Sequence, residues 1–166
     1  MPSSTLLPGT LSRNGRWVYA DDWGWVWRPS VDDGWRPYTA GYWSSGPWGL
    51  TWVDSESWGW SHLARYGRWD FRGGFGWVWI PGRVFSPAHV YWYYGPEYVG
   101  WCPLGWWNRP VHLSISFGWE PRLRFDDCPW WFVGYDHFYG DVRRYQPPRG
   151  AVTADLRRGV RSRAMR

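Results

Sequence analysis

The sequence contains no lysine, few leucine or isoleucine residues and no long hydrophobic run. All 19 basic residues are arginines. Because a membrane-spanning helix needs about 18 or more consecutive apolar residues, the sequence predicts no transmembrane helix. The first fifteen residues lack the basic and apolar regions of a signal peptide, so we expect none. With so few aliphatic side chains, another residue type must supply the core.

Cysteine is also scarce, with only Cys102 and Cys128 in the chain. In an oxidising compartment these residues could form one disulfide worth about 3 kcal/mol, and in a reducing compartment they would be buried thiols. The four histidines are scattered, and neither a C-x-x-C nor an H-x-x-x-H spacing occurs. We therefore expect no metal site and no cofactor.

Charge is distributed unevenly along the chain. Residues 143–166 contain eight arginines and one acidic residue, a net charge of +7, whereas residues 1–142 contain eleven arginines and thirteen acidic residues, a net charge of −2. This pattern predicts a basic tail that is either solvated or docked on an anionic partner. Because the body is near neutral, the charge of the whole chain does not by itself indicate nucleic-acid binding, and we expect none there. The arginines expected to anchor the tail are Arg143, Arg144, Arg157, Arg158, Arg161 and Arg163.

Aromatic residues are abundant where aliphatic residues are not. The chain has 20 tryptophans, 11 tyrosines and 7 phenylalanines. Each large aromatic side chain buries about 150–250 Å², so the indoles are expected to form much of the core. Tryptophans in excess of what one small core can hold would form exposed patches, which commonly mark interaction surfaces.

One short pattern recurs three times. The stretches "GRWVY", "GYWSS" and "GRWDF" place Trp17, Trp43 and Trp69 at intervals of 26 residues. Each is followed by a partner stretch, "WGWVWRP", "WGLTWV" or "FGWVWIP". Aromatic and β-branched residues alternate with a period of two, and turn-forming residues separate the two stretches of each pair, which together indicate β-hairpins.

The sequence therefore predicts an all-β fold with a basic C-terminal tail. Repeated antiparallel hairpins, with a period of about 26 residues, would form a curved sheet, a small barrel or a sandwich. We divide the chain into an N-terminal extension at residues 1–10, a Trp-rich hairpin repeat domain at 11–142 and an Arg-rich tail at 143–166.

The motifs "GRWVY", "GWVWRP", "GWVWIPG" and "YVGWCPL", in this order, resemble those of a Trp-rich bacterial domain of unknown function. The resemblance covers about residues 11–108. In Gram-negative bacteria such domains often occur in exported proteins, sometimes beside a FecR-type regulator domain. The resemblance implies a periplasmic or envelope-associated location, and it implies no activity, ligand or catalytic residue.

Tryptophans near the ends of strands are the best candidates for a binding surface. Binding residues often lie in such connections, and an indole face suits the axial C–H groups of sugars and cations. A Gly-Trp element recurs after each hairpin, at 34–38, 59–63 and 100–104. The candidate residues are Trp35, Trp58, Trp60, Trp101, Trp106 and Trp107.

Catalysis has less support from the sequence. Adjacent aspartates at 21–22, 32–33 and 126–127 could supply the two carboxyl groups of a glycoside hydrolase, but each pair lies in a predicted turn, where aspartate is favoured for backbone reasons. We therefore predict a non-catalytic, envelope-associated binding or assembly module that engages a glycan polymer or a protein partner. The alternative is a structural subunit of a larger complex anchored by the Arg-rich tail, and the third is a glycan-acting hydrolase.

Overall fold

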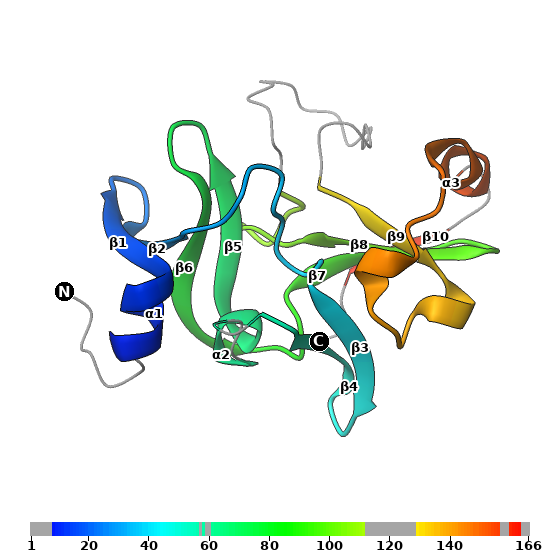
Figure 1. Ribbon diagram of the computed structural model, residues 1–166, viewed down its shortest axis with the longest axis horizontal. Coiled ribbons are helices and arrows are strands. Elements are labelled where there is room, and N and C mark those ends of the chain that lie inside the picture. The colour runs from blue at the N-terminus through cyan, green and yellow to red at the C-terminus, as the bar shows by residue number, and fades with distance from the viewer. Residues whose placement is uncertain (1–7, 57, 59–60, 112–128, 157–159, 164–166) are drawn as a thin grey trace.

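The computed structural model describes residues 8–56, 58, 61–111, 129–156 and 160–163, whose strands form three antiparallel sheets (Figure 1). The first sheet contains, in spatial order, β1 (Gly15–Ala20), β2 (Gly24–Pro29), β6 (Gly76–Phe85) and β5 (Tyr66–Arg72). The second contains β10 (Val160–Arg163), β7 (Val90–Tyr94), β8 (Tyr98–Pro103) and β9 (Trp131–Gly134). The third pairs β3 (Gly41–Gly46) with β4 (Gly49–Asp54).

Short helices lie before and between these strands. They are α1 (Pro8–Asn14), α2 (Ser61–Arg65), α3 (Arg149–Leu156) and the 3₁₀ turns η1 (Tyr135–His137) and η2 (Val142–Arg144). None of the described helices is long and apolar enough to cross a membrane. The all-β prediction is confirmed, and none of the three sheets closes into a barrel.

All three predicted hairpins are present, and each aligns tryptophans across its strands. Trp17 pairs with Trp27, Trp43 with Trp52, and Trp69 with Trp79. Trp27 also pairs with Trp79, so the first sheet carries one indole from each strand in a single row. In the second sheet, Trp92, Trp101 and Trp131 form a similar row. Side chains directly opposite one another lie on the same face, so the buried indoles of these rows pack together in the central core.

The first and third hairpins are related by an approximate internal duplication. Their inner strands, β2 and β6, pair antiparallel through Trp27 and Trp79, which occupy equivalent positions. A helix precedes each hairpin, and each indole N–H donates to a carbonyl in that helix: Trp27 to Leu11 at 3.0 Å and Trp79 to Leu63 at 3.1 Å. The duplicated unit is therefore a helix plus a hairpin, which the 26-residue repeat alone does not reveal.

A glycine two residues before each first-strand tryptophan makes room for an indole of the partner strand. A Cβ atom on Gly15 would lie 2.6 Å from Trp27, one on Gly41 would lie 2.7 Å from Trp52, and one on Gly67 would lie 2.8 Å from Trp79. These separations are too short for a carbon side chain. The glycine of the recurring G-x-W pattern is therefore needed at the start of each hairpin, because a larger residue would collide with the indole of the partner strand.

The C-terminal segment packs on the body of the same chain. β10 pairs antiparallel with β7. In α3, which precedes β10, the buried Asp155 accepts hydrogen bonds from the Tyr93 hydroxyl and from the backbone N–H groups of Glu97 and Tyr98. In its described part, the Arg-rich segment is thus folded rather than a freely solvated tail (Figure 1).

Candidate functional site

The structure places the predicted binding tryptophans in different environments. Trp106 and Trp107 are exposed, with 40% and 75% of their surface accessible. Trp35 is half-buried, whereas Trp58 and Trp101 are buried, with 7% and 1% accessible. The sixth candidate, Trp60, lies outside the described residues.

Trp101 belongs to the core rather than to an exposed corner. It lies in the indole row of β8, packs against Trp43 at 5.3 Å between ring centroids, and donates its indole N–H to the Tyr38 carbonyl at 2.8 Å. Trp35, by contrast, lies in the segment that follows β2. The recurring Gly-Trp dipeptide therefore does not mark one structural position. Its tryptophan lies in a loop at Trp35 and in a buried strand at Trp101.

Trp106 and Trp107 project from a tight turn that is bound to the first sheet. Within the turn, Asn108 N–H donates to the Gly105 carbonyl at 3.0 Å. The Trp106 N–H donates to Asp70 Oδ2 at 3.0 Å, and Arg68 donates to Asn108 Oδ1 at 2.6 Å. Both anchoring residues belong to β5. These hydrogen bonds hold the turn that carries Trp106 and Trp107.

A buried histidine extends this network into the fold. Arg68 also contacts His89 Nδ1, and His89 Nε2 lies 3.0 Å from the Arg65 carbonyl. These partners require a neutral imidazole that accepts at Nδ1 and donates from Nε2. Burial, with the nearby Arg68 charge, lowers the pKa of His89 to about 4, which keeps the ring neutral near physiological pH. The protonation state of His89 therefore does not change in that range.

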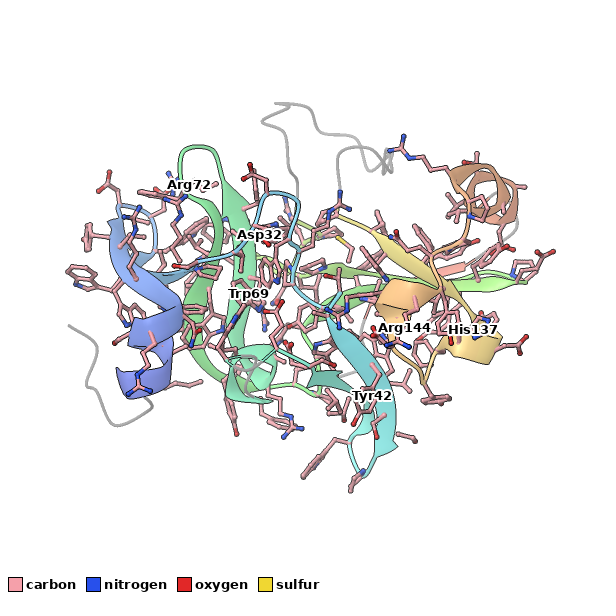
Figure 2. All side chains as sticks on the ribbon, viewed as in Figure 1. Asp32, Tyr42, Trp69, Arg72, His137 and Arg144 are labelled. Carbon is pink, nitrogen blue, oxygen red and sulfur yellow. The ribbon has the colours of Figure 1, made fainter. Side chains whose placement is uncertain are left out.

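Three predicted residues from separate parts of the chain meet at a separate cleft. The cleft has a volume of about 460 Å³. Trp35 and Trp58 line it together with Arg143, which the sequence assigned to the tail. Asp32 and Glu56, of which the sequence analysis did not single out Glu56, also line it. Figure 2 labels Asp32 above Trp69 in its view.

Two carboxyl groups lie at the end of β4, that of Glu56 in the lining of the cleft and that of Asp54 next to it. Asp54 Oδ1 accepts from the Glu56 N–H at 3.1 Å, and Asp54 Oδ2 lies 3.4 Å from the Trp52 indole nitrogen, which donates to it. Burial raises the pKa of Asp54 to about 7. Burial also raises the pKa of Glu56, although the Trp35 hydrogen bond opposes that change.

The raised pKa of Asp54 predicts a specific pH dependence of stability. Because the folded state holds a proton that the unfolded chain releases above its ordinary pKa of 3.8, Asp54 loses stabilising free energy as the pH rises from there to about 7. Asp54→Asn, which mimics the protonated form, should therefore gain stability relative to the wild type across that interval, by at most about 1.4 kcal/mol per pH unit. Urea unfolding at a series of pH values measures this difference. A difference that stays constant with pH would contradict the assignment.

The remaining predicted residues are placed as follows. Arg143 and Arg144 both contact Asp141, at 3.3 Å and 3.5 Å. Arg161 and Arg163 lie in β10, and Arg157 and Arg158 lie outside the described residues. Cys102 is buried, and Cys128 lies outside the described residues, so the disulfide stays a prediction.

Several residues of both sites were not predicted from sequence. Asp70 and Trp106 are 36 residues apart, and no local pattern connects them. Asp54 and Glu56 did carry a signal, because two carboxylates spaced by two residues come directly after the stretch "LTWV". Among the described residues, no group of three or more His, Cys, Asp or Glu side chains could hold a metal ion.

The fold and these surfaces define an all-β protein with an indole-rich core and a displayed pair of tryptophans. The chain belongs to a family of unknown function, DUF6600, whose model matches residues 9–108. That match includes the three hairpins, β7, β8 and the Trp106–Trp107 pair, and it ends before β9, α3 and β10. No curated protein and no solved structure matches the chain.

Proposed function

We propose that this protein is a non-catalytic binding module of the bacterial envelope that engages a glycan or a protein partner through exposed aromatic side chains. The observation that carries the proposal is the Trp106–Trp107 pair. Two adjacent indoles are exposed on a turn whose backbone and side chains are held by β5. The envelope location is what the sequence resemblance implies.

The physical argument rests on the cost of displaying these side chains. An exposed indole loses the free energy that burial would supply, and two neighbouring ones enlarge the apolar surface in contact with water. Asp70, Arg68 and Asn108 hold the turn in place, so little conformational entropy is lost when a ligand binds. Preorganised aromatic side chains of this kind commonly dominate binding energy.

Replacing both Trp106 and Trp107 with alanine should abolish most of the binding while leaving the fold intact. We expect the affinity for a bound glycan polymer to fall by at least about tenfold, since the loss of an anchoring aromatic side chain typically costs 2 kcal/mol or more. A panel of bacterial glycan polymers, tested by co-sedimentation and calorimetry, measures the change.

The matched control is the Tyr19→Ala, Trp25→Ala double variant. This pair is also exposed, with 58% and 38% of the surface accessible, and its rings contact each other at 5.7 Å on the first hairpin. It should retain wild-type affinity. Equal losses in both double variants would show that the Trp106–Trp107 turn is not the binding surface. If no glycan binds, and a protein is captured by the wild type but not by the Trp106→Ala, Trp107→Ala variant, the ligand of the turn is a protein rather than a glycan.

The two other functions have weaker support. A tail that anchors the protein to a larger complex would have to do so with a segment whose α3 and β10 pack on the body of the same chain. A hydrolase would need a reactive pair of carboxyl groups, and Asp54 with Glu56 is the pair that burial perturbs. Release of reducing ends from a glycan by the wild type, lost in Asp54→Asn, would replace the binding proposal with that activity.

A further inference from the structure

The cleft beside Trp35 is a second site, distinct from the Trp106–Trp107 turn. Trp35 packs against Trp69 of β5 at 5.2 Å between ring centroids, whereas the backbone of Trp106 is bound by Asp70 of the same strand. Successive residues of a strand point to opposite faces of its sheet. The two sites are therefore on opposite faces, and either can be altered without touching the other.

The aromatic wall of the cleft is fixed in orientation. Trp35 contacts Trp58 at 5.6 Å and Trp69 at 5.2 Å between ring centroids. Its indole N–H donates to Glu56 Oε1 at 2.7 Å. An indole that is packed on two neighbours and hydrogen-bonded at its edge presents a defined surface to whatever occupies the cleft.

Glu56 leaves one acceptor unused. While Oε1 accepts from Trp35, Oε2 is buried and has no hydrogen-bond donor among the described residues. A buried oxygen without a donor destabilises the fold, and a ligand that supplies an N–H or O–H group removes that cost. Because Glu56 lines the cleft, a ligand that brings such a donor to Oε2 would be favoured there.

The charges around the cleft favour a cationic donor. Asp32 and Glu56 supply two carboxyl groups to its lining. Arg143 is the basic residue of that lining, and its guanidinium already donates to Asp141 from Nε at 3.3 Å. Negative charge in the wall is thus only partly compensated, and an ammonium group next to an indole gains a further attraction to the ring.

We propose that this cleft binds a sugar unit that carries a protonated amino group, with the ammonium donating to Glu56 Oε2. The volume of about 460 Å³ lies within the usual range for small-ligand sites and accommodates one or two sugar rings. Ser30 and Thr39 add hydroxyl groups to the lining, and Trp35 and Trp58 supply apolar surface for the ring carbons. This inference goes beyond the proposed function, because it needs neither Trp106 nor Trp107.

Calorimetry on the full chain tests the proposal with three β-1,4-linked disaccharides, of glucosamine, of N-acetylglucosamine and of glucose, slightly below neutral pH. We expect the glucosamine disaccharide to bind at least about tenfold more tightly than the other two, because only its nitrogen is charged. Glu56→Gln should weaken that binding by about tenfold or more. Glutamine retains an acceptor for the Trp35 indole, so the cleft should keep its shape.

Two further variants separate this site from its surroundings. Asp33→Asn removes an exposed carboxylate next to Asp32 that does not line the cleft, and it should change affinity less than twofold. The Trp106→Ala, Trp107→Ala variant should also bind the disaccharide normally, even if it loses the glycan polymer. Equal binding of all three disaccharides, equal losses in Glu56→Gln and Asp33→Asn, or no binding of any disaccharide would overturn the inference.

Discussion

Replacing Trp43 with alanine is expected to lower the free energy of unfolding by about 3–5 kcal/mol. Trp43 has no accessible surface and contacts three other indoles, those of Trp52, Trp92 and Trp101, at 5.2, 4.5 and 5.3 Å between ring centroids. These partners belong to two different sheets. The loss would be a large part of the roughly 5–15 kcal/mol that stabilises a typical domain.

The same hairpin offers a matched control. Trp48 is 64% exposed and contacts Phe85 at the end of β6, so Trp48→Ala should cost no more than about 1 kcal/mol. Trp43→Phe provides a milder core variant. The Trp43 indole nitrogen has no hydrogen-bond partner among the described residues, so this substitution loses no hydrogen bond. Urea unfolding measures all three variants. Similar losses for Trp43→Ala and Trp48→Ala would contradict a core centred on Trp43.

Gly67→Ala should destabilise the protein by about 3 kcal/mol or more. Gly67 has a φ of +95°, a conformation that strains any residue with a Cβ atom. It also lies where the β5–β6 register shifts, and an added Cβ would collide with the Ile80 carbonyl oxygen and the Trp79 indole. Backbone strain and overpacking each cost about 1–3 kcal/mol, so their sum is large.

Gly73→Ala is the control for this prediction. Gly73 lies in the turn that follows β5, and a Cβ atom there would meet nothing within 4 Å. We expect a change within about 0.5 kcal/mol, measured by thermal and urea unfolding of the two variants side by side. If Gly67→Ala is as stable as Gly73→Ala, the indole of Trp79 does not pack over Gly67.

Local patterns accounted for much of the secondary structure. The alternation in "GRWVY" and "GWVWRP" predicted a hairpin over 15–29, and the structure pairs Trp17 with Trp27 and Tyr19 with Trp25. The 26-residue interval located the two later hairpins. The helices α1 and α2 were missed, although Leu11 and Leu63 occupy equivalent places before the two GRW stretches.

Burial was harder to predict than strand position. Of the candidate tryptophans, Trp106 and Trp107 proved exposed while Trp58 and Trp101 are buried. A period of two shows that a strand has two faces, but when both faces carry large apolar residues it does not show which one the rest of the chain covers. The cleft was not predicted either, because Trp35, Glu56 and Arg143 come from three separate segments that no local pattern connects.

By itself, the sequence determined the strands, the hairpin turns and the reliance on indoles for the core, because alternation, turn chemistry and composition act between near neighbours. Only the tertiary structure decided that β2 pairs with β6, that β10 pairs with β7, and which indoles meet water. Those outcomes depend on contacts between residues far apart in the chain. Their free energies reflect competition among many aromatic surfaces of similar size, which no short stretch of sequence encodes.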